Sequence, residues 1–248
     1  SKAREFEVDR QARFMKGSGL PLRIPVIEMV EIGAGGGSIA RVNSMNQIMT
    51  GPDSAGANPG PAAYNKGGDQ PTISDADIHL GRIDPDYFAG GRVKLMPDLS
   101  SLAIERIVAK PLGIPTQMAA LGVTEMVDET MANAARVHAV ERGYDARDHA
   151  LIAFGGAAPL HVGRIAEKLN ISKIVIPTNA GVGSAIGFLR APVAYEVVRS
   201  RNTFLRDLDS QVINSLMHEM QAEAMSVVHA GAPNEKIIEH RVAFMRYA

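Results

Sequence analysis

The feature that most constrains the fold is a strand–helix–strand pattern around two adjacent glycines. In the letters HALIAFGGAAPLHVGRIAEKLNISKIVIP, residues 150–154 are typical of one buried strand and residues 173–177 of another. Residues 157–169 between them predict a helix, entered through the turn Gly155-Gly156. Because a helix that connects two strands of one sheet leaves them parallel, the pattern predicts an α/β fold.

The Gly155-Gly156 turn has two interpretations. Glycine lets the backbone lie flat against a ligand, and the free amides of a helix start favour a negative or polar group. A tight turn without a ligand explains the same letters. The segment matches neither GxGxxG nor a Walker A loop. His161 lies in the first turn or so of the predicted helix, where it would either face the same ligand as a catalytic group or be a hydrogen-bonded packing residue.

A second glycine cluster, GAGGGS, lies between a strand-like run at 22–33 and a shorter one at 38–42. It places Gly33, Gly35, Gly36 and Gly37 within five positions, which is more glycine than a two-residue hairpin turn needs. A loop that cradles a phosphate or a substrate is one interpretation. The other is a loose hairpin, in which 38–42 returns over the glycines.

The next segment combines a long loop with a short helix that begins with acidic residues. Residues 51–71 are dense in Gly, Pro, Asn and Asp and predict a loop of specific shape. Residues 72–83 predict a helix with Ser74 as its N-cap. Asp75 and Asp77 would either hold Mg²⁺ or support the helix. We favour the structural role for Asp77 and leave Asp75 open as a catalytic candidate.

The remaining pattern is mostly helical. Residues 115–142 give the strongest periodicity, with Met118, Leu121 and Val127 among the residues near one face and Gly143 as the C-cap. The other expectations are a short helix or arm over 1–20, helices over 99–109, 179–192 and 207–230, a strand in VAYEVVRSRN (193–202) and a strand in KIIEHRVAFMRY (236–247).

Composition excludes several classes of function. The net charge of −1 leaves no basic excess for a nucleic acid. The sequence has no cysteine, which excludes disulfides and thiolate chemistry and fits the reducing cytoplasm. It lacks the run of about 18 apolar residues that a membrane span requires. Since it opens on Ser1 and not on Met, we expect a piece of a longer chain.

Taken together, the segments resemble the hydantoinase A / 5-oxoprolinase family, which includes subunits of acetone and acetophenone carboxylases. The likeness covers roughly residues 20–200, and residues 204–248 resemble the start of the family's C-terminal region. The expected division is therefore 1–203 and 204–248. The segments that carry the resemblance are RIPVIEMVEIGAGGGSIARV, GPDSAGANPGPAAY, PTISDADIHLGRIDPDYFAGG, ERGYDARDHALIAFGGAAPLH and GVGSAIGFLRAPVAYEVVRS.

The resemblance implies part of an actin/Hsp70/sugar-kinase-like (ribonuclease H-like) ATPase fold that binds ATP and Mg²⁺ in a cleft. Residues 150–161 match the family's adenosine motif. Its implied cofactor-binding residues are Gly155, Gly156 and Ala157 against the nucleoside, with Gly33, Gly35, Gly36, Gly37 and Ser38 lining the cleft. Asp75 and His161 are the catalytic candidates, and the metal ligands are unassigned.

The implied activity is ATP-dependent phosphorylation of an amide or ketone carbonyl, for ring hydrolysis or carboxylation, with a second, hydantoinase B-like subunit as partner. The alternative is a non-catalytic nucleotide-binding or scaffold half of a split subunit. Two features depart from the family. The upstream phosphate loops are missing, so the 248 residues alone should not turn over ATP, and Asn58 stands where many members have Asp.

Overall fold

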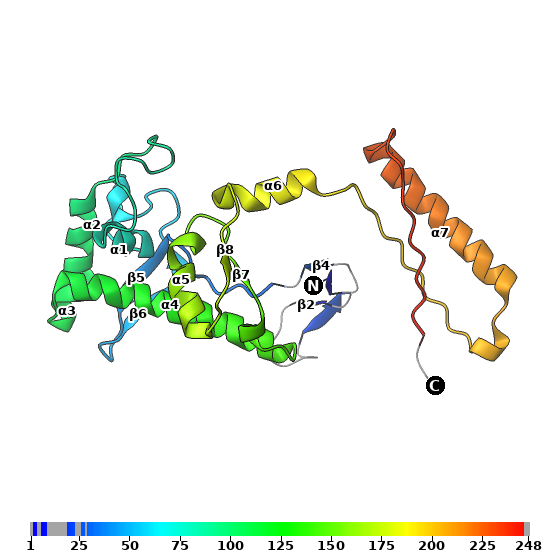
Figure 1. Cartoon of the computed structure of the whole chain (residues 1–248), viewed down its shortest axis with the longest axis horizontal. Coiled ribbons are helices and arrows are strands. Elements are labelled where there is room, and N and C mark those ends of the chain that lie inside the picture. Colours follow the sequence, from blue (N-terminus) through cyan, green and yellow to red (C-terminus); the bar gives the residue numbers. More distant parts are fainter. Residues whose placement is uncertain (1, 4–5, 9–18, 23–25, 28, 246–248) are drawn as a thin grey trace. The chain divides into compact units, whose positions relative to one another are not determined.

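The computed structural model describes residues 2–3, 6–8, 19–22, 26–27 and 29–245 (Figure 1). The chain divides into two compact units, Ser1–Ser184 and Ala185–Ala248. This boundary follows the compactness of the chain and is not a family boundary. The family-based boundary expected between residues 203 and 204 therefore stays a prediction.

The first unit opens with short antiparallel strand pairs. Strand β1 (Lys2–Ala3) pairs with β4 (Val26–Ile27), and β2 (Phe6–Val8) pairs with β3 (Leu20–Leu22). The described part of 1–20 therefore forms strands where we expected a helix or an arm, and residues 9–18 lie outside the described residues.

A hairpin follows the second glycine cluster. Strand β5 (Ser38–Val42) pairs antiparallel with β6 (Ile48–Ser54), through a turn in which Asn46 is left-handed. The expectation that 38–42 returns over the glycines is therefore wrong, because the Asn-rich turn sends the chain forward into β6. Strand β6 also takes the first residues of the expected loop 51–71.

The helices of the first unit follow the sequence pattern with small shifts. Helix α1 (Ile73–His79) is capped by Thr72 and not by Ser74. The long helix α4 (Thr116–Glu141) appears as expected, and the left-handed Gly143 follows its end. The other elements are η1 (Ala62–Tyr64), α2 (Pro97–Ile104), the π-type turn η2 (Glu105–Ala109), α3 (Lys110–Leu112) and η3 (Ala146–Asp148).

The main core lies where α4 packs against α1, η2 and the β5–β6 hairpin. Its residues are small or β-branched on α4, which lets the helix approach closely. Met118 and Leu121, expected on one face with Val127, are more exposed and line a cavity instead. The fully buried core members are Ala40, Ile73, Ala76, Ile104, Val108, Ala119, Ala120, Val123 and Val127.

The predicted strand–helix–strand unit is confirmed. Strand β7 (Leu151–Ile152) pairs in parallel with β8 (Ile174–Val175), and α5 (Ala158–Leu169) connects them. Helix α5 ends at the left-handed Asn170. It packs along α4 through an apolar cluster that includes Ala132, Ile165 and Leu169.

The second unit contains most of helix α6 (Gly183–Arg190), the turn η5 (Leu205–Asp207), helix α7 (Ser210–Gly231) and extended segments, while the turn η4 (Ala180–Val182) still belongs to the first unit. Helix α6 follows η4, and α7 follows η5 with Asp209 as its N-cap. The strand expected at 193–202 is not formed, nor is one in the described part of 236–247, because neither pairs with a neighbouring strand. None of the described helices has the length and apolarity needed to cross a membrane.

Candidate functional site

The glycine loop at 33–37 is shaped by close approach of the protein to itself. The amide of Ser74 donates to the carbonyl of Gly36 over 2.8 Å. A Cβ added at Gly36 would lie 2.6 Å from Oγ of Ser74, and one added at Gly37 would lie 2.9 Å from Oγ of Ser54. Glycine at both positions therefore lets the loop lie against α1 and β6.

Ser38 closes this loop from inside. Its buried Oγ accepts from the amide of Gly35 and donates to the carbonyl of Gly33, both over 3.0 Å. Gly33 is left-handed, with φ +61°, while a Cβ at Gly35 would meet open space. Gly35 is therefore the loop position with most room for a ligand, and the cofactor-binding role of the five residues stays a prediction.

Asp75 is fully buried and accepts five hydrogen bonds. Its Oδ1 accepts from the amide of Ala63 and from Ser100 Oγ. Its Oδ2 accepts from the amides of Ala62 and Thr72 and from Thr72 Oγ1. The Asp75 amide in turn donates to Thr72 Oγ1, which completes a capping box.

This arrangement favours the structural interpretation of Asp75. Both carboxylate oxygens are committed to protein donors, which tie the loop before α1 and helix α2 to the start of α1. A carboxylate so engaged has little capacity left for Mg²⁺ or for a reacting group. The catalytic role of Asp75 stays a prediction, and the geometry supports the alternative that it holds the helix N-terminus.

The Gly155-Gly156 turn differs from the first glycine loop because it faces open space. The amide of Gly155 donates to the carbonyl of Ala180 over 2.7 Å, and Gly155 has φ +97°. A Cβ at Gly156 would meet nothing within 4 Å. Helix α5 starts next, with Ala157 as N-cap, and none of the described side chains caps its first turn. The turn therefore has room for a polar ligand, although Pro159 has no amide hydrogen and the Leu160 amide already donates to the carbonyl of Ala157.

His161 lies in the first half of α5, but it is buried between two carboxylates. Its Nδ1 is 2.8 Å from Oδ1 of Asp128 on α4, in hydrogen-bond geometry. Its Nε2 is 3.2 Å from Oδ2 of Asp77 on α1, close enough for an ion pair but not aligned for a hydrogen bond. All three side chains are almost fully inaccessible to solvent. We call Asp77, His161 and Asp128 the buried triad.

The triad favours a protonated imidazole. Burial lowers the pKa of His161, but the hydrogen bond to Asp128 and the interaction with Asp77 outweigh it and raise the pKa to about 9. Asp77 also accepts a hydrogen bond from Arg82 Nη1 over 3.1 Å. Two carboxylates therefore balance an imidazolium and a guanidinium, which keeps the buried charge close to zero.

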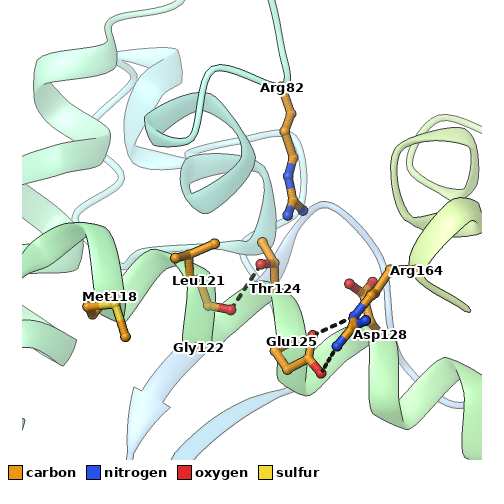
Figure 2. A pocket seen from close by; sticks show the side chains of 8 residues that line it. All are labelled: Arg82, Met118, Leu121, Gly122, Thr124, Glu125, Asp128 and Arg164. Carbon is orange, nitrogen blue, oxygen red and sulfur yellow. Dashed lines mark hydrogen bonds and ion pairs between the residues drawn. The ribbon is translucent and has the colours of Figure 1, made fainter. Parts of the chain in front are cut away.

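A cavity of about 450 Å³ adjoins the triad. Figure 2 shows Arg82 reaching toward α4 from the loop after α1, with Arg164 of α5 beside Glu125 and Asp128. Neither Arg82 nor Asp128 stands out in the sequence as a site residue. The one available signal for Asp128 was its place directly after the apolar Val127 on a long predicted helix, where a charged side chain lies close to the buried face. The lining residues are Arg82, Met118, Leu121, Gly122, Thr124, Glu125, Asp128 and Arg164.

One rim of this cavity is an ion-pair network between α4 and α5. Glu125 accepts from Nε and Nη2 of Arg164, both over 3.1 Å, and from Nζ of Lys168 over 2.6 Å. Lys168 also donates to Glu129 over 2.8 Å. The hydrogen bonds from Arg164 and Lys168 lower the pKa of Glu125 to about 2.

Glu125→Gln should lower the free energy of unfolding by about 1 kcal/mol or less, because the Glu125 side chain is 47% exposed and solvent screens it. A depressed pKa stabilises the fold above the ordinary value, so the difference should disappear as the pH falls from about 4.5 toward 2. Urea denaturation at low and high salt measures it. Glu141→Gln, an exposed change on the same helix outside this network, is the control, and a difference independent of salt would contradict the network.

The described residues do not supply a metal centre of their own. Across the described stretches, no group of three or more His, Cys, Asp or Glu side chains is arranged to hold a metal ion. Asp75 and Asp77 are two residues apart in sequence, but they serve different hydrogen-bond networks. The two carboxylates therefore point to different partners, and a role of Asp75 in holding Mg²⁺ stays a prediction.

Comparison with known proteins places this arrangement in a family. The family model described as hydantoinase/oxoprolinase matches residues 2–197, which include both glycine segments and the triad. The chain belongs to the hydantoinase/oxoprolinase family.

Relatives in this family act on quite different compounds. The caprolactamase subunit alpha of Pseudomonas jessenii is 37% identical over 205 residues, which are 82% of this chain and 30% of that protein. The acetophenone carboxylase gamma subunit of Aromatoleum aromaticum is 40% identical over 181 residues, which are 73% of this chain and 24% of that protein. This hydantoinase/oxoprolinase-family chain thus spans about a quarter to a third of these relatives.

A solved structure shares the architecture. The nucleotide-free structure of acetone carboxylase, an enzyme of ATP-dependent acetone carboxylation, superposes with a TM-score of 0.73 at 31% identity. The match covers 84% of this chain and 30% of that one. The α/β class expected from the sequence is confirmed.

Proposed function

We propose that this chain is part of an ATP-dependent hydantoinase-, oxoprolinase- or carboxylase-type subunit, which activates an amide or ketone carbonyl by phosphorylation. The observation that carries the proposal is the family match, which includes both glycine segments. The ATP dependence named for acetone carboxylation supports it. The first unit would then be part of an actin/Hsp70/sugar-kinase-like ATPase fold.

The open turn at Gly155-Gly156 is the best candidate for the nucleoside contact. A Cβ would meet nothing at either glycine, so the turn that leads into α5 has room for a polar ligand edge. ATP would supply the phosphoryl group, and positioning with charge neutralisation is what such a transfer needs from a protein. The described residues offer no metal cluster, so we assign no Mg²⁺ ligand among them.

The substrate and the partner follow the relatives' chemistry. We propose a small molecule with an unreactive carbonyl, either a cyclic amide or a ketone, as the substrate. The relatives' names describe an alpha and a gamma subunit, which supports a second subunit in the working enzyme. Purification of the native complex, followed by mass spectrometry of its components, tests for that partner.

Gly156→Leu should weaken nucleotide binding at least about tenfold in the complete enzyme while the enzyme stays folded. A side chain there would project into open space, so it collides only with a bound nucleotide. Calorimetric titration with ADP and a thermal melt measure the two effects.

Gly163→Leu is the matched control. Gly163 lies on the exposed side of the same helix and also has open space around its Cβ position. The control should bind ADP as the wild type does and be slightly more stable, since leucine favours a helix over glycine. Equal ADP affinity in both variants would remove Gly156 from the nucleotide site.

A further inference from the structure

The buried triad joins three elements of the first unit through polar contacts. Asp77 comes from α1, Asp128 from α4 and His161 from α5, and each is at most 2% exposed. Helices α4 and α5 also meet through aliphatic side chains such as Ile165 and Leu169 and through the surface ion pairs of Glu125. A directional hydrogen bond at Nδ1 and an ion pair at Nε2 fix the position of α5 against both neighbours.

The same contacts connect the two glycine segments. At one end, the amide of Ser74 in α1 holds the carbonyl of Gly36. Asp77 follows three residues later, about one helical turn along α1. Asp77 contacts His161, which lies in α5 shortly after Gly156. The path therefore runs through about one turn of each helix and a single ion pair.

We propose that the buried triad is a positioning clamp that holds the Gly155-Gly156 turn at a fixed place relative to the Gly33–Gly37 loop. His161 is then a positioning residue and does not itself touch the substrate. Both of its ring nitrogens face protein carboxylates, and the ring is closed off from solvent. The inference rests on the proposed function, because it assumes that a nucleotide binds at the Gly155-Gly156 turn.

The charges around the imidazole explain why neutralising one carboxylate should loosen the clamp. Asp77 faces the ring from α1 and Asp128 from α4, and Arg82 holds the far oxygen of Asp77. Asp77→Asn keeps the volume and leaves an oxygen for Arg82, but removes the charge that attracts Nε2. The start of α5 then loses its link to α1, while the α4–α5 network of Glu125 and Arg164 stays intact.

The test uses the complete enzyme and compares the wild type with Asp77→Asn and Arg164→Gln. We expect Asp77→Asn to raise the KM for ATP and the Kd for ADP about tenfold to 100-fold, because small misplacements of a binding group are costly. The KM for the carbonyl substrate should change much less. Arg164→Gln breaks surface pairs between α4 and α5 but keeps all three triad side chains and their contacts with one another, so its ATP parameters should match the wild type.

A second measurement separates positioning from simple loss of stability. Removing a carboxylate lowers the pKa of His161, so in Asp128→Asn the KM for ATP should begin to rise at lower pH than in the wild type. An unshifted profile would overturn the clamp. If neither carboxylate variant folds, the wild type alone provides the test. A KM for ATP that does not change between pH 7 and 10 would then overturn the clamp.

The outcomes distinguish the clamp from the function on which it rests. A wild-type enzyme that binds neither ATP nor ADP contradicts the proposed function, and the clamp falls with it. A wild type that binds ADP, together with a folded Asp77→Asn that binds it equally well, contradicts the clamp alone. A folded Asp77→Asn with a selectively raised KM for ATP supports both.

Discussion

Asp75→Ala should lower the free energy of unfolding by about 4 kcal/mol, a large effect for a single polar residue. The carboxylate accepts hydrogen bonds from the amides of Ala62, Ala63 and Thr72, all of them buried. Alanine would leave these donors without a partner in a site closed to water. Each such loss costs about 1–3 kcal/mol, and partial relaxation reduces the sum.

Urea denaturation followed by circular dichroism measures this effect as a shift in midpoint. Asp53→Ala is the matched control, because Asp53 is an exposed carboxylate whose pair with Arg41 lies on the surface. It should change the unfolding free energy by no more than about 0.5 kcal/mol. An unchanged midpoint for Asp75→Ala, combined with loss of activity, would instead favour the catalytic role.

The second large effect is a dependence of stability on pH that comes from His161. Its pKa is about 9 in the folded chain, against an ordinary value of 6.5. A raised folded pKa stabilises the fold fully below 6.5, and this contribution is lost as the pH rises through 9. The wild type should therefore lose about 3 kcal/mol of unfolding free energy over this range from His161 alone.

His161→Gln isolates this contribution, because other groups titrate near pH 9 in both proteins. The variant keeps a hydrogen-bonding side chain of similar size but has no proton to lose. Subtracting its pH profile from that of the wild type should leave a difference that is constant below pH 6.5 and shrinks up to pH 9 or beyond. A difference that grows with pH would mean that His161 is buried in its neutral form.

The local sequence pattern predicted helices and turns well where neighbouring residues alone determine the structure. The periodicity of α4 and the glycines before α5 predicted both helices, and the parallel pairing of β7 with β8 followed from them. The partner of β5 was not predictable in this way, because antiparallel pairing with β6 is decided by the turn at Asn46 and by packing. The strands predicted at 193–202 and 236–247 are wrong in the described residues for a related reason. A strand needs a neighbouring strand to pair with, and alternation in the sequence does not show whether one is present.

The candidate site shows the same division. The sequence predicted His161 near the start of the helix after Gly155-Gly156, and it lies there in α5. Its two carboxylate partners come from other helices, and its catalytic role stays a prediction. Asp77 was favoured as structural from its helix position alone, and its contact with His161 was not foreseen. Asp75 shows most clearly why: its donors lie on η1, before α1 and on α2, and only the folded chain brings them together.

The ion pairs between α4 and α5 have a consequence for behaviour on heating. Burying the Lys168 side chain, which is 12% exposed, beside its half-exposed glutamate partners becomes less costly at higher temperature, because the hydration of charged groups grows less favourable. The aliphatic contacts of Ile165 and Leu169 in the same interface gain no comparable advantage. The contact between α4 and α5 should therefore weaken less on warming than the purely apolar parts of the core. In a thermal melt, the α4–α5 contact should be among the last contacts to be lost.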